Sequence, residues 1–179
     1  MCSGVESGTV SASQWDQWAQ GAACPFDVPR AKSNEYWDFV GSLTVSSLYL
    51  SSNQTYRGHC LLILDLRHAT RPDQLSSDEW RAFCADLYLA EKAIIGTLHP
   101  DHINVALLGN VVPHLHWHIV PRYQNDPRWQ APIWTTTTAE MPTTRLPESE
   151  RANLIEKLRI ALNSSAMLAP RPAVLSIGA

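Results

Sequence analysis

Three histidines stand at alternate positions in the segment His114-Leu115-His116-Trp117-His118. Side chains alternate between the two faces of a β-strand, so in a strand all three imidazoles would lie on one face. Their Cα atoms would be about 6.5 to 7 Å apart, because a strand rises by about 3.3 Å per residue. The leucine and the tryptophan between them would face the core. The spacing therefore predicts a concentration of imidazoles in one small volume.

Three interpretations of such a cluster compete. The imidazole of His116 can act as a nucleophile toward phosphorus while its neighbours hold phosphate oxygens. The three imidazoles can instead bind a metal ion such as zinc. The pattern can also be accidental, which we weigh least because strict alternation backed by apolar residues is rare by chance. A nucleophile needs a lone pair, and clustered imidazoles resist joint protonation, so the residue type suits the first interpretation.

Four apolar segments separated by turns and loops are typical of strands. They are Leu43–Leu50, Cys60–Leu64, Ile103–Leu108 and His114–Pro121. Ser76 and Glu79 form a capping box that predicts the start of a long helix, and Pro100 marks its end. Shorter helical patterns occupy Ser13–Ala19, with its first serine as N-cap, and Glu148–Asn163. Hairpin-connected strands around one long helix predict an α+β domain on an antiparallel sheet.

The composition is that of a globular protein, with 45% hydrophobic and 17% charged residues in a chain of 179. The formal net charge is −3 and the pI is about 6.1, so no general basic surface recruits nucleic acid. No stretch approaches the roughly 20 apolar residues that cross a bilayer, and residues 1–10 lack the features of a secretory signal. The four scattered cysteines are typical of reduced thiols. We expect a cytoplasmic protein without a nucleic-acid or membrane partner.

The triad segment resembles the signature of the histidine-triad (HIT) family, in which histidines alternate with hydrophobic residues. Gly58-His59 is similar to the start of the Gly-His strand of that family, whose histidine joins the triad in space. Gly109-Asn110 resembles the glycine-led loop before the triad, and His68 stands where many members carry a histidine. The resemblance extends over residues 24–123.

Because members of this family are nucleotidyl hydrolases and transferases, the resemblance implies a fold and an activity. The fold would be a five-stranded antiparallel sheet with packed helices, usually assembled as a homodimer. His116 would attack the α-phosphorus of a nucleotide, and water would release a nucleoside monophosphate from the covalent nucleotidyl-histidine. His118 would bind a phosphate oxygen, His114 would orient the cluster, and His59 would complete the proton network. No catalytic metal would be needed.

The resemblance also implies substrate contacts. Asn53 follows the first long strand, where relatives place an acidic or amide residue on the ribose, and Ser51 is the alternative. Asn104 and Asn110 can contact phosphate or ribose, and Phe26 can line a base pocket. Each of these residues also suits a purely structural role.

Two positions bear on the reaction type. Val111 departs from the family pattern, because many members carry serine or threonine there to assist the leaving group. His118 favours the hydrolase branches, because phosphorylase-like relatives carry glutamine there. We therefore expect a hydrolase of dinucleoside polyphosphates or AMP conjugates. The alternatives are a nucleotidyltransferase, and a zinc-binding or nucleotide-sensing module without turnover.

A metal site is a separate question. Cys24-Pro25-Phe26-Asp27 is similar to the Cys-x-x-Cys of zinc-binding members, with Asp27 in place of the second cysteine. With His68 and a triad histidine, Cys24 and Asp27 can form a mixed structural zinc site. We favour loss of the metal, because a carboxylate is a poorer ligand than a thiolate in such a site.

The flanks of the resemblance have less pattern. We predict an N-terminal extension at residues 1–20, a histidine-triad domain at residues 21–165 and a C-terminal tail at residues 166–179. Trp129 and Trp134 lie in an aromatic, threonine-rich loop that can serve as a lid or a dimer contact.

Overall fold

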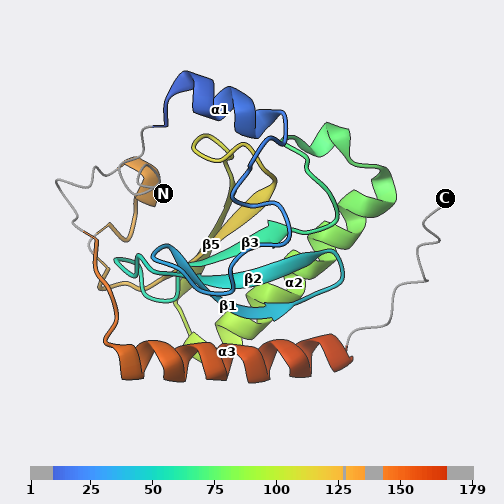
Figure 1. Ribbon diagram of the computed structural model, residues 1–179. Coiled ribbons are helices and arrows are strands. Elements are labelled where there is room, and N and C mark those ends of the chain that lie inside the picture. Colours follow the sequence, from blue (N-terminus) through green and yellow to red (C-terminus); the bar gives the residue numbers. More distant parts are fainter. Residues whose placement is uncertain (1–9, 127, 136–142, 169–179) are drawn as a thin grey trace.

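The computed structural model describes residues 10–126, 128–135 and 143–168 and has a single antiparallel sheet as its centre (Figure 1). Its five strands are β1 (Trp37–Ser42), β2 (Ser46–Ser51), β3 (Cys60–Leu64), β4 (His102–Leu107) and β5 (His116–Arg122). They lie in the order β1-β2-β3-β5-β4, and every neighbouring pair is antiparallel. The predicted α+β class with a five-stranded antiparallel sheet is confirmed.

The helices follow the predicted pattern with one correction. They are α1 (Ala12–Ala19), α2 (Ser77–Leu98) and α3 (Glu148–Leu168), with short 3-10 helices η1 (Pro72–Gln74) and η2 (Ile133–Thr135). The capping box of α2 is formed as predicted: Ser76 Oγ accepts from the N–H of Glu79 at 3.3 Å, and the Glu79 carboxylate accepts from the N–H of Ser76 at 2.7 Å. The N-cap of α1 is Ser11 and not Ser13, because Ser11 has the extended backbone from which its hydroxyl reaches a helical N–H at 3.2 Å.

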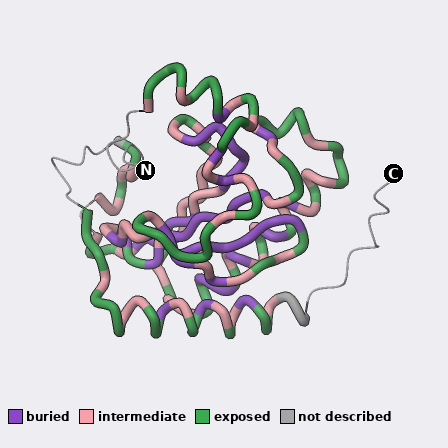
Figure 2. The backbone as a smooth tube through the Cα atoms, viewed as in Figure 1, coloured by how far each residue is buried: buried purple, intermediate pink, exposed green. Residues whose placement is uncertain are grey.

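A hydrophobic core lies on each face of the sheet. One face packs against α2 and α3, and Phe83 of α2 is fully buried in this layer, with its ring against Trp117 of β5. The opposite face, toward α1, carries a smaller cluster that includes Phe26, Trp37 and Tyr49. Figure 2 shows the buried segments concentrated in the strands between these layers. Strands β2 and β3 are buried along their whole length, as predicted for Cys60–Leu64.

The sequence pattern does not predict β1. Its register with β2 shifts between Phe39 and Gly41, and its Asp38 is buried in an ion pair with Arg151 of α3. A bulge and an inward carboxylate both obscure the alternation that marks a strand. The predicted strand Leu43–Leu50 is correspondingly too long at its start, because a turn separates β1 from β2.

The triad strand is shorter than predicted. β5 begins at His116, and His114 lies in the turn before it, where its N–H bonds the carbonyl of Val112 at 2.8 Å. The prediction that all three histidines share one strand is therefore wrong for His114. The inward position of Trp117 is partly confirmed, because its indole is half-buried against Trp80, with ring centroids 5.8 Å apart.

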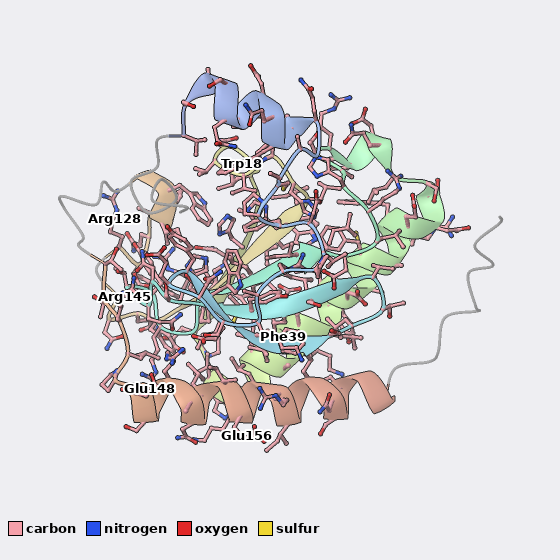
Figure 3. All side chains as sticks on the ribbon, in the orientation of Figure 1. Trp18, Phe39, Arg128, Arg145, Glu148 and Glu156 are labelled. Atoms are coloured by element: carbon pink, nitrogen blue, oxygen red, sulfur yellow. The ribbon has the colours of Figure 1, made fainter. Side chains whose placement is uncertain are left out.

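Two observations bear on the predicted division of the chain. Trp18 lies between α1 and the sheet and belongs to the smaller core cluster (Figure 3), although it falls in the predicted extension at residues 1–20. Helix α3 continues past residue 165 to Leu168. The boundaries themselves stay predictions, and residues 169–179 of the predicted tail lie outside the described residues. In the described part of the chain, no helix is both long enough and apolar enough to span a membrane.

Candidate active site

Three histidines from two neighbouring strands meet on the α1 face of the sheet. β5 pairs with β3 so that His116 is opposite Ile63 and His118 is opposite Leu61. His59 directly precedes β3, and its ring lies beside that of His118 with centroids 5.4 Å apart. The sheet register therefore brings together residues that are far apart in the sequence.

The glycine before His59 is required by its conformation and its surroundings. Gly58 has a φ of +87°, and a Cβ there would lie 2.2 Å from Leu98 Cδ1 and 3.0 Å from Pro121 Cγ. Other residues would be strained by the backbone and would collide with α2. Gly58 thus allows the chain to cross close to α2 and to bring His59 into the site.

Hydrogen bonds connect the three rings in a chain. His59 Nε2 lies 3.1 Å from His118 Nδ1, and His118 Nε2 lies 3.2 Å from His116 Nε2. His116 Nδ1 lies 2.7 Å from the carbonyl oxygen of His114. A carbonyl only accepts, so His116 Nδ1 carries the hydrogen and Nε2 of the neutral ring carries a lone pair. In this arrangement His118 donates from Nε2 and accepts at Nδ1 from His59.

Burial favours the neutral form of all three rings. It lowers the pKa of His116 and of His59 to about 4, and that of His118 to about 2. For His118, the neighbouring imidazoles of His59 and His116 lower the pKa further. An imidazolium loses its hydration on burial and repels a second one nearby. The site therefore favours the protonation state that a histidine nucleophile needs.

His114 contributes its backbone to this site and its ring to another. Its Nε2 lies 2.8 Å from the carbonyl oxygen of Leu64 and must donate to it. Its Nδ1 faces Cys24 and Asp27, and the residue is 1% exposed. His114 thus positions His116 through its carbonyl, while its imidazole lies in a second cluster.

A cleft of about 320 Å³ opens over His116 and His118. The other lining residues are aromatic, apolar or neutral polar: Phe26, Tyr36, Trp37, Ser51, Ser52, Asn53, His59, Leu61, Leu108, Gly109, Asn110, Val111, Val112, Trp134 and Thr143. None of these lining residues is Lys, Arg, Asp or Glu. Burial holds the imidazoles neutral, so we expect an anionic phosphate to be met by hydrogen bonds from their ring N–H groups and not by a charged side chain.

Three of the four predicted substrate contacts line the cleft: Phe26, Asn53 and Asn110. The ring of Phe26 lies edge-on to that of His116, with centroids 4.9 Å apart. Asn104 is not among the lining residues. Its Oδ1 accepts a hydrogen bond from Arg122 Nη1 at 2.6 Å, so its amide holds a buried arginine.

Two lining residues, Tyr36 and Trp37, escape sequence reasoning. Tyr36 directly precedes β1, the strand that the pattern does not predict, and Trp37 begins it; the adjacent pair of aromatic residues is the signal that was available. Ser51, the alternative ribose contact, also lines the cleft, and its Oγ accepts the N–H of Asn53 at 3.2 Å. Trp134 lies at the cleft from η2, with its ring against His118.

Helix α1 supports one wall of the cleft. It lies over the loop between β4 and β5 (Figure 1), and Trp15 Nε1 donates to the carbonyl of Asn110 at 3.0 Å. Gly109 beside it has a φ of +68°, which favours glycine in this turn. Helix α1, which precedes the residues that resemble the HIT family, thus helps to shape the site.

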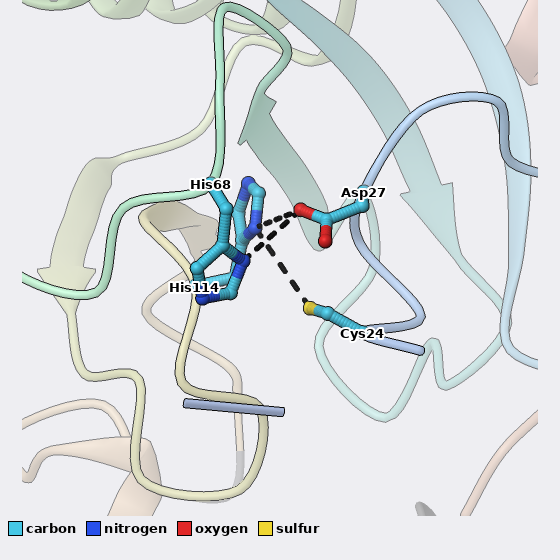
Figure 4. Close-up of side chains that lie close together, drawn as sticks. All are labelled: Cys24, Asp27, His68 and His114. Atoms are coloured by element: carbon cyan, nitrogen blue, oxygen red, sulfur yellow. Dashed lines mark hydrogen bonds and ion pairs between the residues drawn. The ribbon is translucent and has the colours of Figure 1, made fainter. Parts of the chain in front are cut away.

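A second cluster lies behind His114 (Figure 4). The donor atoms of Cys24, Asp27, His68 and His114 all lie within 4.8 Å of one another. Asp27 Oδ1 is 3.0 Å from His68 Nδ1 and 3.2 Å from His114 Nδ1, and Cys24 Sγ is 3.8 Å from His114 Nδ1. The sequence-predicted candidate ligands are therefore brought together, and the triad histidine that joins them is His114.

The donor set fits a tetrahedral zinc ion. Ligand atoms of such an ion lie about 3.3 to 3.8 Å apart, given bond lengths of about 2.0 to 2.3 Å. His114 donates from Nε2 to a carbonyl, the usual outer contact of a metal-bound histidine, and so presents the Nδ1 lone pair to the cluster. His68 lacks such a contact, because its buried Nε2 has no hydrogen-bond partner among the described residues. Burial raises the pKa of the Cys24 thiol to about 11, so metal binding would have to displace its proton.

The HIT domain model matches residues 33–125, just over half of the chain. No curated protein matches the sequence. A histidine triad protein from Bradyrhizobium japonicum is 26% identical, with a TM-score of 0.65 over 72% of this chain and 92% of that one. A histidine triad protein from Marinobacter aquaeolei VT8 is 25% identical, with a TM-score of 0.64 over 73% of this chain and 91% of that one.

A zinc-bound histidine triad family protein from Mycobacterium smegmatis shares the fold at 20% identity, with a TM-score of 0.52 over 82% of this chain and 89% of that one. The family match covers β1 to β5, including His59 and the triad, and so includes the strands that form the site. The chain belongs to the HIT family.

Proposed function

We propose that the protein is a nucleotide hydrolase that cleaves a dinucleoside polyphosphate or an AMP conjugate at the α-phosphate, through a covalent nucleotidyl-His116 intermediate. The HIT family binds nucleotides, and its catalytic members are nucleotidyl hydrolases or transferases. The observation that carries the proposal is the hydrogen bond of His116 Nδ1 to the His114 carbonyl. It fixes the tautomer in which Nε2 carries the lone pair at the cleft.

In the first step, His116 Nε2 attacks the α-phosphorus and forms an N–P bond. The P–O or P–N bond to the leaving group breaks, and the leaving group takes the electron pair. His118 Nε2–H, now directed at His116, donates instead to a phosphate oxygen or to the departing atom. The hydrogen bond of His59 to His118 Nδ1 holds His118 in the donating tautomer, so His59 is a positioning residue.

In the second step, a water oxygen attacks the same phosphorus and the N–P bond breaks. The electron pair returns to His116 Nε2, and the water gives up a proton to the imidazole chain as nucleoside monophosphate forms. Cleavage in two displacements lets one imidazole serve first as nucleophile and then as leaving group. If an acceptor other than water enters, the same intermediate gives a nucleotidyltransferase, which is the close alternative.

For the substrate, we propose that Phe26 and the neighbouring aromatic wall bind the base. Asn53 or Ser51 contacts the ribose, and Asn110 contacts ribose or phosphate. We omit Asn104 because its amide is bonded to Arg122. Val111 offers no hydroxyl, so the hydrogen of His118 is the donor we propose for the leaving group.

A metal-binding module is the second candidate, supported by the convergence of Cys24, Asp27, His68 and His114. An ion there would be structural: it would tie the N-terminal segment to the turn that carries His114. These four side chains are not among those lining the cleft, so we propose that catalysis needs no metal. A nucleotide sensor without turnover remains as the alternative to be tested.

Two further expectations belong to the proposal. We propose that the protein is a homodimer, for which one of the two edge strands, β4, offers the half-buried apolar residues Ile103, Val105 and Leu107. We also propose that it acts in the cytoplasm, consistent with its free cysteines at positions 24, 60 and 84.

The decisive experiment is to identify nucleotide products from adenosine conjugates and dinucleoside polyphosphates, with and without chelator. The full chain should release AMP in both conditions, and rapid acid-free denaturation should trap a labelled adenylyl group on the protein. The His116→Ala variant should show no label. Release that chelator abolishes, after magnesium bound to the substrate is controlled for, would favour a metal-centred reaction. Nucleotide binding without release of any product would favour the sensor.

A further inference from the structure

The two imidazoles of the cleft lie between two aromatic side chains. Ring centroids are 4.9 Å apart at each of three successive contacts: Phe26 with His116, His116 with His118, and His118 with Trp134. Phe26 and Trp134 thus mark opposite ends of one row of rings. A phosphate bound at the imidazoles would have an aromatic side chain on either side of it.

The two aromatic side chains at the ends of this row differ in how much of their surface other side chains cover. Phe26 is 4% exposed and packs edge-on against Trp37, with centroids 5.5 Å apart. Trp134 is 40% exposed and touches His118 edge-on, at 66° between the ring planes. An exposed tryptophan is not by itself evidence of a site. Its position over an imidazole in the lining of the cleft is what matters here.

Trp134 is held in place from β5. Arg122, at the end of that strand, is 2% exposed, and its Nη1 donates to the carbonyl of Ala131 at 3.0 Å. The same guanidinium bonds both carboxylate oxygens of Asp126, at 2.7 and 2.9 Å, and the carbonyl of Arg128. The strand that carries His118 therefore also fixes the chain just before Trp134.

The two ends of the cleft therefore suit two different parts of a substrate. The α-phosphorus carries a nucleoside on one side and the leaving group on the other. If the nucleoside occupies the closed aromatic end at Phe26, the group beyond the phosphate extends past His118 toward Trp134. A planar group there would cover the exposed indole, and base–aromatic stacking is favourable without depending on the identity of the base.

We propose that Trp134 is a specificity-determining residue that stacks on the leaving group, and that the enzyme therefore prefers leaving groups that carry a planar aromatic ring. This inference rests on the proposed hydrolase function. A second nucleobase and a simple aryl group both supply such a ring, because stacking is shared by both.

The test compares substrates that break the same α-phosphate anhydride bond. Diadenosine triphosphate, the γ-phenyl ester of ATP and the γ-methyl ester of ATP differ in the group at the far end of the leaving phosphates. The readout is the ratio of kcat/KM for each ring-bearing substrate to that for the methyl ester. We expect the ratio to fall on the order of tenfold in Trp134→Ala and less in Trp134→Phe. Trp129→Ala, in the same loop but outside the cleft lining, is the matched control and should keep the ratio.

The outcomes distinguish the stacking role of Trp134 from the proposed hydrolase function on which it rests. A ratio that is the same in wild type and both Trp134 variants overturns the stacking role. A fall for diadenosine triphosphate alone identifies a nucleobase as the preferred ring, and a fall for both substrates identifies any aryl group. If the wild type turns over none of the three, the hydrolase proposal fails. The ratio of dissociation constants for the methylene-bridged analogues of these compounds then tests Trp134 directly.

Discussion

The two histidine clusters that meet at His114 place the same residue type in different surroundings. In the cleft, His59, His116 and His118 bond one another and a backbone carbonyl, and burial keeps them neutral. In the second cluster, His68 and His114 face a carboxylate and a thiol. The first arrangement gives His116 a lone pair at Nε2, and the second gathers ring nitrogens, a carboxylate and a thiol around a common centre. In our proposal, the groups that surround a histidine, and not the imidazole itself, decide whether it serves as a nucleophile or as a metal ligand.

The largest effect should come from removing the nucleophile. We expect His116→Ala to lower kcat on the order of a thousandfold or more, because His118 carries a hydrogen at Nε2 in the proposed arrangement and does not offer a lone pair there. Zinc content, measured by atomic absorption after equilibration with zinc, should stay the same, because the His116 ring is not in the second cluster. His102→Ala, an exposed histidine on β4, is the control. Activity close to wild type in His116→Ala would refute the nucleophile assignment.

The sequence predicts most of the first cluster because its signals are local. Strand alternation places His116 and His118 on one face, and the capping box at Ser76 places α2. The pairing of His59 with the triad came from the resemblance, since only the register of β3 with β5 brings them together. Strand alternation fails for His114, which a turn removes from β5 and directs into the second cluster.

The remaining site residues depend on contacts that no local pattern carries. Asn104 looks as suitable a substrate contact as Asn110, yet the buried guanidinium of Arg122 occupies its amide. Trp37 is missed because the bulge and the buried Asp38 obscure β1. In each case a charged group that is buried with its partner overrides the simple rule that polar residues face solvent.

A smaller effect on rate, combined with loss of metal, should follow from changing the shared residue. His114→Ala keeps the backbone carbonyl that holds His116 but removes a ring from the second cluster. We expect zinc binding to be lost and kcat to fall about 10- to 100-fold, because the turn that aims the carbonyl loses its support. The measurements are zinc content and kcat on the same preparation. A loss of activity as large as that in His116→Ala would mean that the His114 ring takes a direct part in the reaction.

Restoring a thiolate should strengthen the second cluster alone. We expect Asp27→Cys to raise zinc affinity by about tenfold or more, equivalent to about 1.4 kcal/mol, because thiolate is the preferred ligand in structural zinc sites. Asp27→Asn, which removes the charge at similar size, should lower the affinity. Competition with a chromophoric zinc chelator measures both. Absence of zinc binding in wild type and in Asp27→Cys would support our sequence-based expectation that this chain has lost the metal.

The smallest effect should come from the wall that α1 supports. Trp15→Phe keeps an aromatic ring but removes the hydrogen bond from Nε1 to the carbonyl of Asn110, at 3.0 Å. Such a bond contributes about 1 kcal/mol, so we expect about a fivefold rise in KM for the nucleotide with kcat little changed. Asp16→Ala, on the exposed surface of the same helix, is the control for general loss of α1. If kcat fell and KM stayed constant, the loop at Asn110 would act on the reacting groups and not on binding. The loop at Gly109 and Asn110 would then have to be counted as part of the first cluster.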